Sequence, residues 1–235
     1  GAHSGETFLV DNTDPTVAVI YGGDADPFRD ADTVTITAAI TDDSEIVGTP
    51  QVSIVYEGGF TDSGAMTEVD NTEWTYTFDI PGGSDGTAQI TITAQDAADN
   101  PMGAHTGNTF EVDNTGPAVA LTYDDVGPFL YQDTVRVTAT FTDASDIVGT
   151  PQIEIAYGDG FTDSGSMTEL GNQEWFYDID VPAGSDGIAQ VAITAQDAAG
   201  NPVGSLTGDT FSVDNTPPTV ALSYDVADPR SEERR

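Results

Sequence analysis

The chain has 235 residues and no cysteine, and its five basic residues face 41 acidic ones, which gives a formal net charge of −36. This charge argues against binding to nucleic acid or insertion at anionic membranes, because both interactions need cationic side chains. The lack of cysteine excludes a disulfide framework, and no run approaches the roughly twenty apolar residues that span a bilayer. The composition instead favours divalent cations or a very salty medium as partners of the surface.

One short motif recurs three times and divides the chain. It reads Val-Asp-Asn-Thr-x-Pro, follows an aromatic residue, and stands at 10–15, 112–117 and 213–218. The copies are about 100 residues apart, the length of one small domain. We therefore expect two tandem repeats, 13–113 and 114–214, each able to bury its own core. Residues 1–12 are expected to be the tail of a preceding repeat and 215–235 the start of a third, so that the chain is a segment of a longer array.

The strands of the first repeat can be taken in chain order. Valine and isoleucine alternate with threonine between frequent turn residues, and this period of two predicts an all-β sandwich without helices. Strands are predicted at 17–21, 33–41, 51–56, 66–69, 74–80, 88–94 and 109–112, and again about 101 residues later in the second repeat. Trp74 and Trp175 recur at one strand position and are expected in the cores.

Seven strands with this spacing resemble the bacterial immunoglobulin-like repeats of large secreted surface proteins and adhesins. The resemblance rests on the three joint motifs, on Gly-Thr-Pro at 48–50 and 149–151, and on Ala-Gln-Asp-Ala-Ala-x-Asn-Pro at 94–101 and 195–202. It implies two immunoglobulin-like (Greek-key) β-sandwich domains in tandem. It also implies a non-enzymatic stalk or spacer at the cell surface, outside the cell, in contact with neighbouring repeats of the same chain.

In the immunoglobulin-like topology, the entry joint and the loops after the second and sixth strands converge at one end of each sandwich. These three places are rich in oxygen ligands. The first repeat holds Asp11, Asn12, Asp42, Asp43, Glu45, Asp96, Asp99 and Asn100 there, and the second holds Asp113, Asn114, Asp143, Asp146, Asp197 and Asn201. Carboxylates gathered in a small space repel one another unless a cation neutralises them, and a hard oxygen-rich set without cysteine suits calcium. We therefore expect calcium at the joints.

The arrangement is similar to the cadherin junction, in which an Asp-Asn linker and two loops of the following domain bind calcium against the base of the preceding one. By this likeness, the base of the first repeat adds Asp85 or a residue from 24–32. Two alternatives to calcium stay open. In one, the motif is only a turn, since Asp, Asn and Pro are ordinary turn formers. In the other, the acidity is that of a salt-adapted surface, which predicts acids over strand faces, whereas 33–37 and 189–196 carry none.

Other functions compete with the stalk. Unpaired strands at the two ends could join identical chains end to end into a filament or surface layer. A carbohydrate or ligand site would need an exposed aromatic platform, for which Phe28, Phe129 and Tyr131 are the candidates. An enzyme is not expected, because with only His3 and His105 in the chain no catalytic triad can be assembled, and no carboxylate pair stands out.

Overall fold

The computed structural model describes residues 10–22, 26–30, 32–204 and 209–224, and within them all regular structure is β-strand. The first sandwich contains β1 (Thr16–Gly22), β2 (Thr33–Thr41), β3 (Ile46–Tyr56), β4 (Thr61–Ala65), β5 (Thr67–Glu68), β6 (Glu73–Asp79), β7 (Gly86–Asp96) and β8 (His105–Val112). The second contains β9 (Ala118–Tyr123), β10 (Thr134–Thr142), β11 (Ile147–Ala156), β12 (Thr162–Ser166), β13 (Thr168–Gly171), β14 (Glu174–Asp180), β15 (Gly187–Asp197) and β16 (Thr210–Val213).

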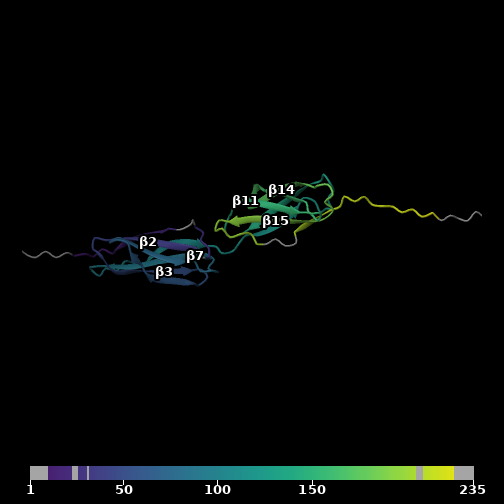
Figure 1. The fold of residues 1–235 in the computed structure, drawn as a ribbon. Helices are drawn as coiled ribbons and strands as arrows, with labels where there is room; N and C mark the ends of the chain where they lie inside the picture. Colours follow the sequence, from purple (N-terminus) through teal and green to yellow (C-terminus); the bar gives the residue numbers. More distant parts are fainter. Residues whose placement is uncertain (1–9, 23–25, 31, 205–208, 225–235) are drawn as a thin grey trace, which may run out of the picture.

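These strands form four antiparallel sheets, two for each sandwich (Figure 1). In the first sandwich the sheet orders are β1-β2-β6-β5 and β4-β3-β7-β8, and in the second they are β13-β14-β10-β9 and β12-β11-β15-β16. Strands far apart in the sequence therefore pair, as in Greek-key sandwiches. The prediction of two immunoglobulin-like β-sandwiches is confirmed.

The core of each sandwich follows from the alternation of the sequence. Every second residue of β2 is buried, and these residues share one core with buried residues of β3 and β7 in the opposite sheet. An aromatic residue of the joint motif lies in each core: Phe110 contacts Phe28 edge to face with ring centroids 5.5 Å apart, and Phe211 contacts Phe129 at 5.7 Å. The joint is thus anchored directly in the core that precedes it.

Two strand predictions need correction. The third strand begins at Ile46 and not at residue 51, because Gly48, with φ of +72°, forms a bulge between Val47 and Gln51 and the pairing with β7 continues on both sides of it. The short strand predicted at 66–69 is found as the two-residue β5, but the prediction missed β4 just before it. The two strands belong to different sheets, and Met66 turns inward between them and is buried.

The strand faces carry more acidic residues than the sequence suggested. Asp79, Glu154, Asp178 and Asp180 are exposed on strands. Cross-strand hydroxyls or arginine satisfy three of them: Thr33 Oγ1 donates to Asp79, Thr134 Oγ1 donates to Asp180, and Arg136 pairs with Asp178. The expectation that acids gather in loops therefore holds only in part.

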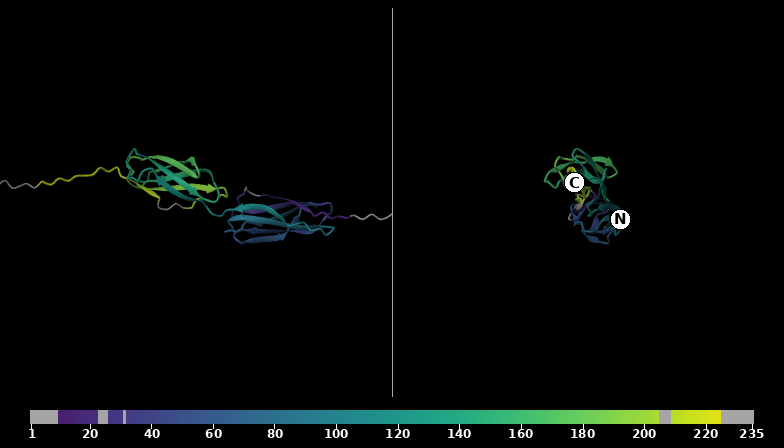
Figure 2. Two further views of the ribbon diagram at one scale, coloured as in Figure 1. Left: turned by 180° about the vertical axis from the view of Figure 1, so that it is seen from behind. Right: turned by 90° about the vertical axis from the view of Figure 1, so that its right-hand side faces the viewer.

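The two sandwiches follow each other along the chain in an extended arrangement, and the described ends point away from each other (Figure 2). The crossing from one to the other is the short segment between β8 and β9. Across the described residues, no helix long and apolar enough to cross a bilayer is found.

Candidate metal centre at the joint

Three acids from each predicted set meet in space. Carboxylate oxygens of Asp11, Asp42 and Asp96 lie within 4.8 Å of one another, and so do those of Asp113, Asp143 and Asp197. We call the first group the N-terminal cluster and the second the joint cluster. In each, one acid comes from the joint motif, one from the loop after β2 or β10, and one from the end of β7 or β15. Such clusters could hold a metal ion.

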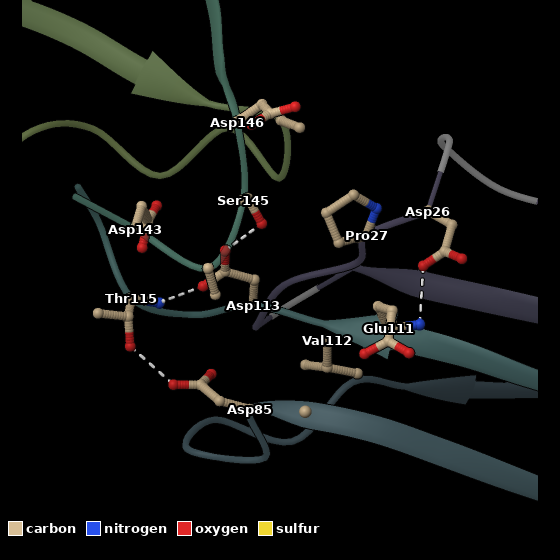
Figure 3. A pocket seen from close by; sticks show the side chains of 13 residues that line it. Asp26, Pro27, Asp85, Glu111, Val112, Asp113, Thr115, Asp143, Ser145 and Asp146 are labelled. Atoms are coloured by element: carbon tan, nitrogen blue, oxygen red, sulfur yellow. Dashed lines mark hydrogen bonds between the residues drawn. The ribbon is translucent and has the colours of Figure 1, made fainter. Parts of the chain in front are cut away.

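The joint cluster is the more enclosed of the two. Asp197 is 0% exposed and Asp113 is 4% exposed. The Asn201 backbone N–H and side-chain amide both donate to the Asp197 carboxylate, at 2.8 and 2.9 Å. The Thr115 backbone N–H donates to Asp113 Oδ1 at 3.0 Å, and the Ser145 hydroxyl donates to Asp113 Oδ2 (Figure 3). These bonds fix two carboxylates beside each other without neutralising their charge.

Asp143 is the acid of the joint cluster that has a buried oxygen without a donor in the described part of the chain. Its Oδ2 atom is buried, and among the described residues no group donates to it. Burial, followed by the negative charges of Asp113 and Asp197, raises the pKa of Asp143 to about 6. Below about pH 6, a proton on Asp143 therefore competes with a cation for the same carboxylate. A buried carboxylate oxygen without a donor, between two other carboxylates, is suited to ligate a divalent cation.

The N-terminal cluster is more exposed, and two of its acids, Asp11 and Asp96, are stabilised in the charged form. Hydrogen bonds from the Ser44 and Thr13 side chains lower the pKa of Asp11 to about 2. Burial raises the pKa of Asp96, but hydrogen bonds from Asn100 and Ala98 outweigh it, so the net shift is downward. Asp11 and Asp96 therefore keep their negative charge over the whole physiological pH range.

The other predicted ligands lie away from the cluster oxygens or turn a donor toward them. Asn100 and Asn201 donate through Nδ2 to the clustered acids Asp96 and Asp197 and to the linker carbonyls, so they organise the clusters. Asp146 accepts from the Gln173 side chain. Asn114 faces the first repeat, where the Asp30 backbone N–H donates to it. The remaining four are exposed: Asn12, Asp43, Glu45 and Asp99.

Sequence reasoning missed Ser44 and Ser145, whose hydroxyls each donate to the linker aspartate of their cluster. The signal for them was present, because both serines stand two residues after the clustered loop acid, Asp42 or Asp143. A serine carries no charge and is common in loops, so its recurrence alone did not single it out.

An acidic cleft of about 590 Å³ opens beside the joint cluster (Figure 3). It is lined from both repeats and from the linker between them. Its acids are Asp26, Asp85, Glu111, Asp113, Asp143 and Asp146. The base of the first repeat thus faces the loops of the second across the linker, as the cadherin likeness implied, although Asp24 lies outside the described residues.

A second cleft borders the other side of the linker, and it holds the one arginine of the joint among the described residues. Arg29, Asp30, Asn114 and Asn201 are among its lining residues. The Arg29 guanidinium donates to the carbonyl oxygen of Gly200, in the loop that follows Asp197. The two repeats are therefore joined directly by a hydrogen bond as well as through the linker.

The aromatic platform proposed for a carbohydrate site is wrong. Phe28 and Phe129 are 2% and 5% exposed and belong to the two cores, because their rings pack on Phe110 and Phe211. Tyr131 is exposed, but Phe28 and Phe129, the other two residues of the proposed platform, are not. Trp74 and Trp175 are each 6% exposed, as expected of core residues.

Among solved structures, the chain is similar to a tetra-tandem repeat in the extending region of a large adhesion protein, at 21% identity and a TM-score of 0.35, covering 84% of this chain and 50% of that one. It is also similar to latent PorU from Porphyromonas gingivalis, at 16% identity and a TM-score of 0.31, covering 88% and 21%. The N-terminal Ig1-2 module of the Drosophila receptor protein tyrosine phosphatase DLAR matches at 12% identity and a TM-score of 0.28, covering 84% and 98%. The chain thus spans half or less of the length of the first two.

No curated protein matches the chain. A protein-family comparison matches residues 72–167 and 173–232 to the bacterial Ig-like domain (group 3), and together these segments make up more than half of the sequence. The matched segments include strands of both sandwiches and the joint between them. The chain therefore belongs to the bacterial Ig-like domain (group 3) family.

Proposed function

We propose that the chain is a non-enzymatic spacer segment of an extracellular, cell-surface protein, and that calcium bound at the joint cluster stiffens it. Membership of a bacterial Ig-like family supports the spacer role, since these sandwiches recur as structural repeats. The adhesin-like setting and the surface location follow from the resemblance of the motifs. The absence of lysine and the high negative charge agree with a partner that is a cation.

One observation carries the calcium proposal. Asp113 belongs to the linker, but one of its carboxylate oxygens lies within 4.8 Å of oxygens of Asp143 and Asp197. These two residues belong to the second repeat, where Asp143 follows β10 and Asp197 ends β15. An ion bound by all three would hold the linker against the second repeat. Without an ion, the three charges repel one another and favour separation of these elements. Calcium suits the set because it accepts six to eight oxygen ligands in irregular geometry, and carbonyls and water can complete the shell.

The mechanism is a shift between orientations. A short linker leaves two sandwiches free to adopt several relative orientations, and an ion that is ligated in only one of them raises the population of that one. The free energy of ion binding also adds to the stability of the folded state, because the unfolded chain lacks the site. Stiffness and thermal stability are therefore expected to rise together.

Thermal unfolding with excess EDTA, with millimolar calcium, and with EDTA in molar sodium chloride tests this proposal. Calcium at about one hundred times its dissociation constant should stabilise the folded state by about 2.7 kcal/mol. For a domain of this size, that stabilisation raises the melting temperature by on the order of 10 °C. Asp143→Asn should abolish the response of the second repeat, whereas Asp43→Asn, at an exposed loop position outside both clusters, should retain it.

An equal rise with sodium chloride alone would contradict the proposal, because it would mean that the charge is only screened. The clustered acids would then be turn residues of a salt-adapted surface. End-to-end assembly of identical chains stays a separate prediction, and light scattering at rising protein concentration tests it: a mass that stays monomeric would exclude it.

A further inference from the structure

The joint motif is bonded to the repeat that precedes it by four hydrogen bonds. The Asp113 backbone N–H donates to the Phe28 carbonyl at 2.8 Å. The Asn114 backbone N–H and the Thr115 hydroxyl donate to the two oxygens of Asp85, each at 2.7 Å. The Asp30 backbone N–H donates to the Asn114 side-chain oxygen. We call this set, which binds linker residues 113–115 to the base of the first repeat, the linker clamp.

The same four bonds recur at the end of the second repeat. Each donor and acceptor has its counterpart about 101 residues later, at the spacing of the repeat itself. The bonds are Asp214 N–H to the Phe129 carbonyl, Asn215 N–H and Thr216 Oγ1 to Asp186, and Tyr131 N–H to Asn215 Oδ1. Asp85 and Asp186 thus play the same part at the two ends, which makes the clamp a property of the repeat.

Each clamp is made only by a repeat and the joint motif at its end. The donors and acceptors of the second clamp are Phe129, Tyr131, Asp186 and residues 214–216. In the first clamp, likewise, none of the four bonds uses a group from the repeat that follows the linker.

We infer that Asp85 and Asp186 are linker-positioning residues, and that the clamp orients residues 113–115 on the first repeat before any ion binds. Both oxygens of Asp85 accept bonds from the linker, and Asp85 is not one of the three acids whose oxygens meet in the joint cluster. Asp113 thereby becomes the hinge point: its backbone is bonded to the first repeat, and its carboxylate faces the second.

This inference deepens the proposed function, because it assigns the two halves of the joint to different interactions. The clamp holds the linker on the first repeat, and the joint cluster holds it on the second. It also replaces the role that the cadherin likeness gave Asp85, that of an ion ligand. Since Asp85 lines the acidic cleft, that role is the competing assignment.

Amide hydrogen exchange of Asn114 and Asn215, followed by NMR in excess EDTA, tests the inference. Both amides should be protected in the wild-type chain without calcium. Asp85→Ala should lower the protection of Asn114 about tenfold or more, since a hydrogen bond to a charged acceptor is lost, and should leave Asn215 unchanged. Asp186→Ala should do the reverse, so that each variant is the matched control of the other. If either variant unfolded its repeat, the other would still decide the matter.

Asp85→Asn separates positioning from ligation, because it keeps an oxygen that can accept from the Asn114 amide but removes the charge. It should restore most of the protection, and the number of calcium ions bound, measured by titration, should be the same in wild type, Asp85→Ala and Asp85→Asn. Unprotected Asn114 in wild type under EDTA, or loss of one bound calcium in Asp85→Asn, would overturn the inference. The exchange measurement contains no calcium, so the clamp and the calcium proposal can fail separately.

Discussion

At the scale of single residues, the joint depends on which carboxylates are satisfied by the protein and which are not. Asp197 receives two bonds from Asn201, and Asp85 receives two from the linker. Asp143 Oδ2 receives none from the described residues. Similar side chains in one region therefore differ in role. Asp197 is a candidate ligand that hydrogen bonds hold in place, Asp143 is a candidate ligand with an oxygen that has no donor among the described residues, and Asp85 accepts bonds from the linker backbone and the Thr115 hydroxyl.

The raised pKa of Asp143 predicts how calcium binding depends on pH. An aspartate whose pKa rises from 3.8 to about 6 on folding stabilises the ion-free fold below pH 3.8, and this contribution is lost as the pH rises through about 6. Calcium must displace that proton. The apparent affinity is therefore expected to be constant above about pH 7 and to fall up to about tenfold for each pH unit between 6 and 4.

Calcium titration calorimetry at about pH 5 and about pH 7.5, in buffers of different ionisation enthalpy, measures both the affinity and the protons released. Proton release on binding should appear at the lower pH and disappear at the higher one. In Asp143→Asn the residual binding should show no such release. The same affinity at both pH values, with no proton released, would mean that Asp143 is not a ligand.

Arg29 offers a second residue-scale prediction. It donates to the Gly200 carbonyl across the joint, and the corresponding residue of the second repeat is Leu130. Arg29→Leu should therefore be compatible with folding but should broaden the distribution of distances between the repeats in EDTA. Because the chain has no cysteine, single cysteines placed in each repeat can carry spin labels for pulsed EPR.

The matched control is Arg136→Leu, which removes an exposed arginine that pairs with Asp178 within the second repeat. It should leave the distance distribution unchanged. If Arg29→Leu gave the same distribution as this control, the contact with Gly200 would contribute nothing to the orientation of the repeats.

At the scale of elements, the sequence predicted the strands wherever apolar residues alternate. The prediction at 33–41 matches β2 residue for residue. The prediction failed where the backbone forms a bulge or an edge strand that the alternation of apolar residues does not show. Gly48 suggests a break but sits in a bulge inside β3, and β4, whose residues are Thr61, Asp62, Ser63, Gly64 and Ala65, has no large apolar residue to reveal it. Edge strands without a buried aliphatic face are invisible to periodicity.

Gly64 in β4 shows what that edge strand packs against. A Cβ at this position would lie 2.7 Å from Cε2 and 3.2 Å from the hydroxyl of Tyr76, whose O–H donates to Asp62 at 2.7 Å. Gly64→Ala must displace this ring, and the free energy of unfolding should fall by about 1–3 kcal/mol. Gly103→Ala, where nothing lies within 4 Å, should change it far less.

Denaturant unfolding of both glycine variants at one calcium concentration measures the difference. Equal losses would mean that the close approach of Tyr76 to β4 does not constrain this edge. The repeat supplies an internal check, because a Cβ at Gly165 would lie 2.6 Å from Cε2 of Tyr177 in the second sandwich. Gly165→Ala should therefore have the same effect as Gly64→Ala.

The candidate site was also only partly predictable at the scale of elements: the positions of its loops followed from the topology, but the directions of its side chains did not. Loop topology brings the entry joint and two loops to one end of a sandwich, so each predicted set of ligands contained the three acids that meet in its cluster, together with others that do not. It could not show which way side chains turn. Asn201 offers its amide and not its oxygen, and Asn114 turns toward the other repeat. The linker clamp was unpredictable because Asp85 and Thr115 are 30 positions apart and look like ordinary turn residues.

At the scale of the whole molecule, the net charge of −36 opposes any compact arrangement of the two repeats. The extended arrangement keeps most of that charge apart and concentrates the conflict at the joint, where acids of both repeats line one cleft. The clamp, Arg29 and a bound ion are three means of holding the joint against that repulsion. Only the last can be added or removed by the medium.

The most direct test of the central claim is small-angle X-ray scattering of one preparation in EDTA, in millimolar calcium, and in EDTA with molar sodium chloride. We predict that calcium alone converts a broad distribution of overall dimensions into a narrow one, and that Asp143→Asn loses this response. Identical scattering with and without calcium, or the same narrowing in sodium chloride with EDTA, would contradict the claim that a specific ion stiffens the joint.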